Sequence, residues 1–248
     1  MNPSCRDLEV HQTWLGELVL RRRDALAPGE PDVYEVTLDD QFLMSSVFNH
    51  SEMALASLGL AGAKADALDV VVGGLGLGCT AVAALADPRL RSLLVVDCLS
   101  EVIRWHEGGL VPLGAQLMAD ARCRLVQGDF FAMAGPGGPG FDPEQAGRRY
   151  HAILMDIDHS PRSLLHGSHQ EFYEPAGLRQ VASHLLPGGV FGLWSADRAE
   201  PEFIDSLEQV FDEFRVHEVE FFNPLLKHDE LHTVYVGRTA SAPAAAAA

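Results

Sequence analysis

Positive charge is scarce in this sequence. Its 248 residues include 18 Lys and Arg against 35 Asp and Glu, which gives a formal net charge of −17 at pH 7. Because nucleic-acid binding needs a basic face, this balance argues strongly against a nucleic-acid partner. An acidic protein attracts cations, so the charge permits a cationic substrate without identifying one.

Long apolar runs and paired cysteines are also missing. No run approaches the roughly 18 apolar residues of a membrane span, and the first residues, MNPSCRDLEVHQ, lack the apolar centre of a secretion signal. We therefore expect a cytoplasmic protein without membrane contact. The four cysteines form no CxxC pair and no zinc spacing, so reduced thiols are expected. No GxSxG motif occurs, which leaves hydrolase chemistry with little support.

The most informative stretch is DVVVGGLGLGCTAVAALADPRLRSLLVVD, residues 69–97. A buried strand, a glycine loop, a helix and a second strand ending on Asp97 are predicted in this order, which is typical of the nucleotide-binding half of a doubly wound α/β fold. Gly74, Gly76 and Gly78 let the backbone approach a ligand, and Asp97 can bind ribose hydroxyls. Their GxGxG spacing differs from the dinucleotide fingerprint GxGxxG, so it favours a nucleoside site without phosphates. An ordinary strand-to-helix turn is the alternative.

Apolar periodicity predicts the other elements. Strand-like segments within residues 8–45 indicate a small N-terminal β-unit. The predicted helices cover residues 51–60, 80–85, 99–106, 111–118, 171–186 and 201–214. The predicted strands cover residues 70–72, 93–96, 124–126, 151–155, 190–195, 216–222 and 233–236, the last two as an antiparallel pair. Residues 134–149 are rich in Gly and Pro, which predicts an exposed loop.

These elements divide the chain into three predicted parts. Residues 1–47 form the N-terminal β-unit, and residues 48–238 form a Rossmann-like catalytic domain. The remaining residues, 239–248, have no core-forming side chains and are expected to be a disordered tail.

Three stretches together resemble the spermidine synthase (polyamine aminopropyltransferase) family. They are LDDQFLMSSVFNHSEM, VVVGGLGLG…VVD…QGDFF and MDIDHSP…EFYEPAGLRQVASHLLPGGVFGLWS. The resemblance covers roughly residues 8–238. It implies an α/β fold of the class I S-adenosylmethionine (SAM) methyltransferase-like type: a doubly wound, mostly parallel seven-stranded sheet with a small N-terminal β-unit. It also implies a homodimer.

The resemblance assigns a donor site residue by residue. Asp97 would bind the ribose, Asp129 the adenine amino group, and Glu52 would help to place the nucleoside or the amine. The family carries GGGDGG, whose Asp grips the aminopropyl amine of decarboxylated SAM, whereas Gly76 stands at that position here. The family's Gln falls at about Leu43, and its DSSDP loop is replaced by DIDHSP. The expected co-substrate is therefore either SAM or decarboxylated SAM.

Carboxylates after the fourth predicted parallel strand are the candidate catalytic groups. An amine must be neutral to attack a sulfonium carbon, and an alkylammonium has a pKa near 10. A carboxylate can bind the ammonium, orient it and accept its proton. Asp156 and Asp158 are the candidates, and alternation along an extended segment predicts that they point to the same side. Capping of a turn is the alternative for one of them.

Histidines near this loop leave two interpretations open. His159, His166 and His169 lie within eleven residues of Asp158, and imidazoles and carboxylates can share a metal ion. Their spacing matches no metal motif, so we expect no metal. We favour His159 as a substrate contact or general base.

Four further residues are expected near the substrates. Trp194 and Ser195 end the fifth predicted parallel strand and can line the acceptor pocket, with core packing as the alternative for Trp194. The resemblance places Tyr173 near the catalytic loop and His50 near the donor.

The leading hypothesis is a transferase that moves an aminopropyl or related alkyl group from a SAM-type sulfonium to a small amine, such as a polyamine. The loss of the glycine-loop Asp favours a first alternative, SAM-dependent methyl transfer to a small, cationic acceptor. A second alternative is a nucleoside-binding protein without catalysis.

Overall fold

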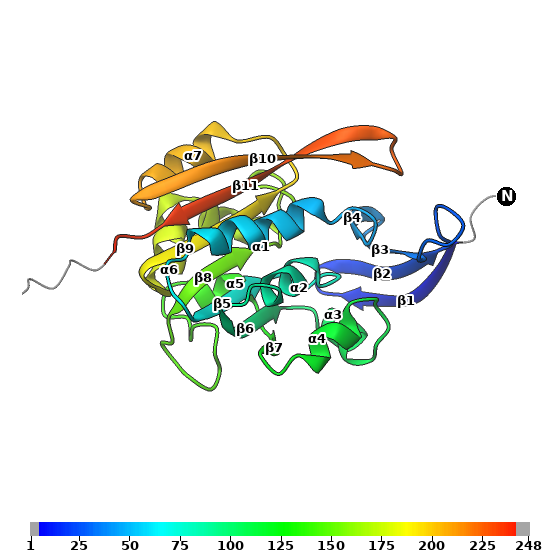
Figure 1. Cartoon of the computed structure of the whole chain (residues 1–248), viewed down its shortest axis with the longest axis horizontal. Helices are drawn as coiled ribbons and strands as arrows, with labels where there is room; N and C mark the ends of the chain where they lie inside the picture. Colours follow the sequence, from blue (N-terminus) through cyan, green and yellow to red (C-terminus); the bar gives the residue numbers. More distant parts are fainter. Residues whose placement is uncertain (1–4, 242–248) are drawn as a thin grey trace, which may run out of the picture.

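A seven-stranded sheet forms the main body of the computed structural model, which describes residues 5–241 (Figure 1). Its strands are β5 (Leu68–Gly73), β6 (Leu90–Asp97), β7 (Cys123–Gln127), β8 (Tyr150–Met155), β9 (Leu185–Ser195), β10 (Glu213–Asn223) and β11 (His228–Arg238). Their order is β10-β11-β9-β8-β5-β6-β7. Strands β5 to β9 pair in parallel, and β11 joins β9 and β10 in antiparallel fashion. The predicted doubly wound sheet is confirmed.

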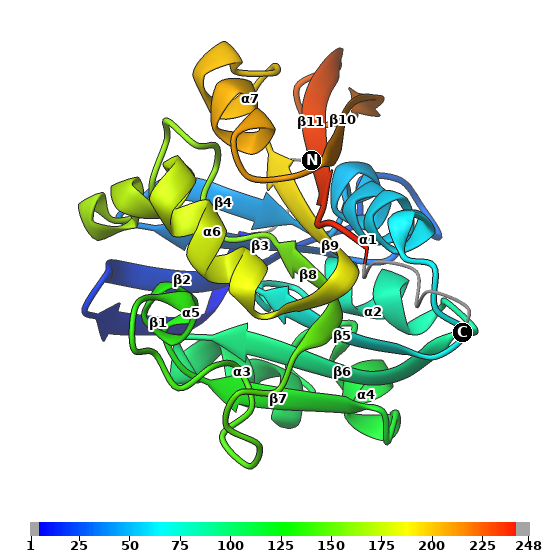
Figure 2. The same cartoon turned by 90° about the vertical axis from the view of Figure 1, so that its left-hand side faces the viewer.

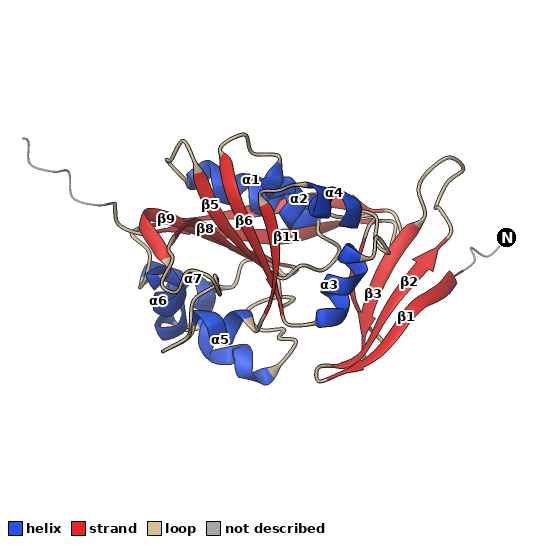
Figure 3. Cartoon of the chain, turned by 90° about the horizontal axis from the view of Figure 1, so that it is seen from below, coloured by secondary structure: helices blue, strands red, loops and turns tan. Residues whose placement is uncertain are grey.

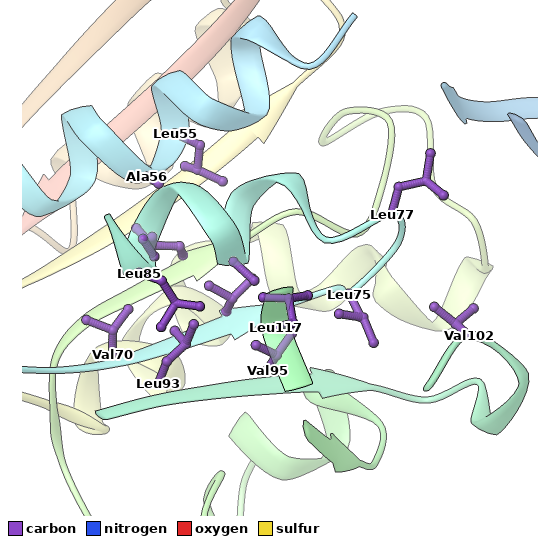
Figure 4. Packing of buried hydrophobic residues seen from close by; sticks show 14 of the residues in the cluster. Leu55, Ala56, Val70, Leu75, Leu77, Leu85, Leu93, Val95, Val102 and Leu117 are labelled. Carbon is purple, nitrogen blue, oxygen red and sulfur yellow. The ribbon is translucent and has the colours of Figure 1, made fainter. Parts of the chain in front are cut away.

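Helices cover both faces of this sheet (Figure 3). One face carries α1 (His50–Gly62), α2 (Cys79–Leu85), α3 (Ser100–Glu107) and α4 (Gly114–Ala119); the other carries α5 (Phe130–Ala134), the 3-10 helix η1 (Gly167–Tyr173), α6 (Pro175–Ser183) and α7 (Pro201–Glu208). Successive residues of a strand point to opposite faces. Val70 and Val72 accordingly join the first core and Val71 the second. Figure 4 shows the first core, in which Leu55 of α1, Leu85 of α2 and Leu117 of α4 lie on the same face of the sheet as Val70.

The N-terminal β-unit is a separate four-stranded antiparallel sheet (Figures 1 and 2). It consists of β1 (Cys5–Thr13), β2 (Gly16–Arg23), β3 (Val33–Leu38) and β4 (Gln41–Ser45). Leu18 and Val36 join the core that lies under α1 to α4, so the unit packs on the main body. In β4, Met44 pairs with Val36 and Phe42 with Thr37, which leaves Leu43 as the extra residue of a β-bulge.

Two predicted helices were too long. The expected helix over residues 171–186 is split into the end of η1 and α6, and β9 already begins at Leu185. Leu185 pairs with Tyr150, so Pro187-Gly188-Gly189 lies within the strand, where a register shift accommodates it. The expected helix over residues 201–214 ends at Glu208, because the chain turns to enter β10.

The Gly- and Pro-rich segment is less exposed than expected. Phe141 and Asp142 within it are buried. Asp142 pairs with Arg148 at 2.9 Å and also with Arg124, which fixes the loop to β7. Of the predicted tail, residues 242–248 lie outside the described residues. Residues 5–241 contain no helix with the length and apolar character of a membrane span.

Candidate active site

Three adjoining cavities lie between the N-terminal β-unit and the carboxyl ends of the parallel strands, where open α/β sheets bind ligands. Cavity A is lined by Asp97, Asp129, Phe131, Asp156, His169 and Met44 among others. Cavity B shares Asp156 and Met44 with A and adds Gly78, Glu52, His159 and Trp194. Cavity C shares Glu52, His159 and Trp194 with B and adds Arg23, Glu230 and His232.

The glycine loop between β5 and α2 passes close to both sides of the site. Gly74 has φ of +92°, and a Cβ there would collide with the backbone carbonyl of Asp156. Gly76 has φ of +48°, and a Cβ there would lie 2.7 Å from Sδ of Met44. An aspartate at position 76 would therefore be strained and would displace the Met44 thioether. Gly74, Gly76 and Gly78 all line cavity A or B.

Asp97 and Asp129 place two carboxylates on the wall of cavity A. Asp97 ends β6 and accepts hydrogen bonds from the backbone N–H of Leu75 at 2.9 Å and of Leu99 at 2.8 Å. Burial raises the pKa of Asp97, while these backbone bonds lower it. Asp129 is the N-cap of α5 and accepts from the N–H groups of Phe131 and Ala132. Each carboxylate retains acceptor capacity for a ligand hydroxyl or amino group.

Glu52 and Asp156 are two half-buried carboxylates that line cavity B. Asp156 follows β8 and accepts a hydrogen bond from Oγ1 of Thr80 at 2.6 Å. Burial raises the pKa of Asp156, and the Thr80 bond lowers it. Burial and then the charge of Asp156 raise the pKa of Glu52 above its ordinary value. Two neighbouring carboxylates whose ionised forms repel each other resist joint ionisation, so the pair can hold and release a proton near neutral pH.

A hydrogen-bond network behind Glu52 joins three distant segments. Oγ of Ser51 contacts Oε2 of Glu52 at 2.8 Å, Nδ1 of His232 at 2.8 Å and Nε1 of Trp194 at 2.9 Å. His232 and Glu230 lie two residues apart on β11 and both line cavity C. Sequence reasoning included Trp194 but missed Ser51 and His232. The alternation of Glu230 and His232 along β11 was the available signal for a shared face.

Asp158 and Tyr173 lie apart from these cavities. β8 ends at Met155 and the chain then bends, so the alternation expected for Asp156 and Asp158 does not continue. Asp158 is buried and accepts from Nδ1 of His169 at 2.9 Å, from the Tyr173 hydroxyl at 2.7 Å and from the Leu165 N–H at 2.7 Å. Neither Asp158 nor Tyr173 lines cavity A, B or C. Their catalytic and substrate roles stay predictions.

Ser195 and His50 also lie off the cavity walls. Because neighbours on a strand face opposite sides, Trp194 lines cavities B and C while Ser195 is buried and accepts from the Asp197 N–H at 3.2 Å. His50 begins α1 and stacks on Phe221, with ring centroids 5.8 Å apart. Their substrate contacts stay predictions.

His159 lines cavities B and C, and His169 lines cavity A. From the sequence, His169 is a candidate only for a metal ligand. Its ring stacks on Phe131 at 3.8 Å between centroids, and its Nδ1 is held by Asp158. Within residues 5–241, no three His, Cys, Asp or Glu side chains are grouped as a metal site requires.

Comparison with known proteins gives structural relatives only. No protein-family model matches the sequence, and no curated protein matches it. A spermidine synthase bound to the transition-state analogue AdoDATO superposes with a TM-score of 0.70 at 15% identity, covering 96% of this chain and 75% of the other. The spermidine synthase of Thermotoga maritima gives a TM-score of 0.66 at 15% identity, covering 96% and 74%.

A probable spermidine synthase from Corynebacterium glutamicum gives a TM-score of 0.60 at 16% identity, covering 96% of this chain and 81% of the other. All three cover 96% of this chain at low identity. The predicted resemblance is thereby confirmed for the architecture: the chain has the fold of the spermidine synthases.

Proposed function

We propose that this chain is a transferase that moves an alkyl group from a SAM-type sulfonium to the nitrogen of a small amine. The observation that carries the proposal is the pair of half-buried carboxylates Glu52 and Asp156, which both line cavity B and have raised pKa values. A carboxylate with a raised pKa is suited to take the proton of an ammonium near neutral pH. The fold shared with spermidine synthases supports the same reaction class.

In this proposal the donor occupies cavity A and the amine enters through cavity C. Asp97 binds the ribose hydroxyls, and Asp129 binds the amino group of the base. Asp156 orients the amine and accepts its proton; the nitrogen then forms a bond to the donor carbon as the carbon–sulfur bond breaks and a neutral thioether leaves. His159, which lines cavities B and C, contacts the amine.

Two donors remain in competition. The shared fold favours decarboxylated SAM and transfer of an aminopropyl group, with a polyamine or related amine as acceptor. The surroundings of Gly76 favour intact SAM and methyl transfer, because Met44 occupies the space that an ammonium-binding Asp side chain would need. An apolar thioether offers no ion pair to the donor's amine.

Calorimetric titration with SAM and, separately, with decarboxylated SAM tests the proposal. Preference for the decarboxylated form supports aminopropyl transfer, and preference for SAM replaces it with methyl transfer. Asp97→Ala serves as the control and is expected to weaken either donor strongly. Binding of neither donor by the folded wild-type chain would contradict the proposal.

A further inference from the structure

The Ser51 hydroxyl contacts as many polar groups as it can form hydrogen bonds with. The residue is fully buried, and its Oγ contacts Nε1 of Trp194, Nδ1 of His232 and Oε2 of Glu52 at 2.8–2.9 Å. A hydroxyl has one hydrogen to donate and two lone pairs that accept. Three partners therefore use its whole capacity, and the direction of each bond is determined by the chemistry of the partners.

The directions follow from which groups can only donate or only accept. The indole N–H of Trp194 only donates, and an ionised Glu52 only accepts. Ser51 therefore donates its hydrogen to Glu52 and accepts from Trp194. Its second lone pair then requires a hydrogen on Nδ1 of His232. In a neutral imidazole, a hydrogen on Nδ1 leaves Nε2 as an acceptor.

A proton on Oε2 of Glu52 reverses two of these bonds. The carboxyl O–H then donates to Ser51, which still accepts from Trp194. Ser51 must donate its own hydrogen to Nδ1 of His232, so the ring hydrogen lies on Nε2. His232 thus changes tautomer, and its Nε2, which lies 3.8 Å from Oε2 of Glu230 on the wall of cavity C, changes from an acceptor to a donor.

We propose that Ser51 couples Glu52 to His232, so that His232 offers an acceptor nitrogen to cavity C only while Glu52 is ionised. This inference rests on the proposed function in taking cavity C as the amine site. Glu52 faces Asp156 and Cys79, and His232 faces Asp197 and Glu230, whose Oε2 lies 3.8 Å from Nε2.

The charge state of His232 fits this role. Burial lowers the pKa of His232, whereas Glu230 and Asp197 act in the opposite direction. The net shift is downward, so the ring is neutral at neutral pH and a choice between two tautomers exists.

The coupling links the binding of the amine to the ionisation of Glu52. An amine with a second amino group that reaches Nε2 of His232 binds best when Glu52 is ionised. Because linkage is reciprocal, the bound amine in turn favours ionised Glu52. His232 is therefore a positioning residue: it acts on Glu52 through Ser51, and it favours acceptors that carry an N–H group beyond the reacting nitrogen.

Tautomers of neutral histidines can be measured directly in the full chain labelled with ¹⁵N at the imidazoles. Two-bond ¹H–¹⁵N spectra distinguish Nδ1–H from Nε2–H rings, and His232→Asn assigns the signal. At alkaline pH the wild type is expected in the Nδ1–H form. Ser51→Ala is expected to shift the tautomer ratio about tenfold toward Nε2–H, the scale of one net hydrogen bond.

Glu52→Ala provides a second test if Ser51→Ala fails to fold. Without the carboxylate, the Ser51 hydrogen is free to reach Nδ1, so the ratio again shifts toward Nε2–H. His217 on β10 lines none of cavities A, B and C, and its signal is the internal reference that should not change.

A pH titration of the wild type tests the effect on substrate. The tautomer is expected to change from Nε2–H to Nδ1–H as the pH rises and Glu52 ionises. Addition of 1,4-diaminobutane is expected to move the midpoint to lower pH, and butylamine, which lacks the second amino group, is not. A wild-type ring in the Nε2–H form at alkaline pH, or a midpoint unaffected by the diamine, would overturn the inference. Neither spectrum requires a donor, so a failure here is distinct from a failure of donor binding.

Discussion

The behaviour of the candidate site depends at the residue scale on two half-buried carboxylates on one cavity wall. Glu52 and Asp156 both line cavity B, and burial is the largest cause that raises the pKa of each. The hydroxyl of Thr80 acts in the opposite direction, because its hydrogen bond stabilises the ionised form of Asp156. A change at Thr80 alone is therefore expected to change the pKa of Asp156.

Asp156→Asn tests the role of the carboxylate in proton transfer. The amide cannot accept the ammonium proton, so turnover should fall by about 100- to 10,000-fold, the usual contribution of a general base. Donor affinity should change little, because Asp97 and Asp129 hold the nucleoside in the proposed arrangement. Steady-state kinetics and calorimetry on the same folded variant separate the two effects. Wild-type turnover in Asp156→Asn would rule out Asp156 as the base.

The pH profile provides a second residue-scale prediction. The base must be ionised, so kcat/KM should rise with pH, with its midpoint above the ordinary carboxyl range of about 4. Thr80→Val removes a hydrogen bond that lowers the pKa of Asp156, so its midpoint should move to higher pH. Thr80→Ser keeps the hydroxyl and is the matched control. An unchanged midpoint in Thr80→Val would mean that Asp156 does not limit the profile.

The site residues that lie at or just after the ends of strands could be predicted from the sequence. Asp97 ends β6, Asp129 lies two residues after β7 and Asp156 directly follows β8, and the carboxyl ends of parallel strands meet at one edge. Sequence reasoning missed Ser51 and His232, which lie 181 residues apart and meet only through the packing of α1 against β11. No local pattern contains that contact.

At the scale of elements, short segments both build the fold and carry site residues. Asp129 caps α5 with its carboxylate and presents the same group to cavity A. Trp194 is the last residue but one of β9 and lines cavities B and C. The strand that precedes each residue was predictable from apolar runs, whereas the early start of β9 was not. There the pairing of Leu185 with Tyr150 outweighs the helical periodicity of the preceding segment.

Substitution of Asp129 separates its two roles. Asp129→Ala removes both the cap and the carboxylate, and should destabilise the fold by about 1 kcal/mol. Asp129→Ser keeps a capping oxygen, so its stability should remain close to that of the wild type. Both variants should lose donor affinity in calorimetry, because neither retains the carboxylate proposed to bind the base. If Asp129→Ser binds the donor normally, Asp129 is a cap only.

At the scale of the whole molecule, the two ends of the parallel sheet respond to pH with opposite signs. At the amino end of β5, burial raises the pKa of Asp69. Hydrogen bonds from Arg91 and Ser92 and the charges of Arg91 and Arg148 have the larger, opposite effect, so the pKa is lowered to about 2. At the carboxyl end, Glu52 and Asp156 have raised pKa values. Ionised carboxylates stabilise the first end and destabilise the second.

The homodimer and the cytoplasmic location stay predictions.

Asp69→Asn tests this contrast through stability. A carboxyl whose folded pKa is lowered stabilises the protein above its unfolded pKa, about 3.9, and this stability disappears as the pH falls toward the folded value of about 2. The variant should therefore unfold at a lower temperature than the wild type at pH 7, and the difference should shrink between about pH 4 and pH 2. Thermal unfolding across this range measures both. A constant difference would show that the ion pairs of Asp69 do not contribute.

The bulge in β4 has a kinetic consequence. Leu43 and Met44 are adjacent in the chain, and both line cavities A, B and C. The cavities proposed for the donor and for the amine consequently have one wall in common, built from a strand of five residues. A shift of this strand on occupation of one compartment would reshape the other, so the two substrates are not expected to bind independently. The order in which they enter and the order in which the products leave would then be set by β4.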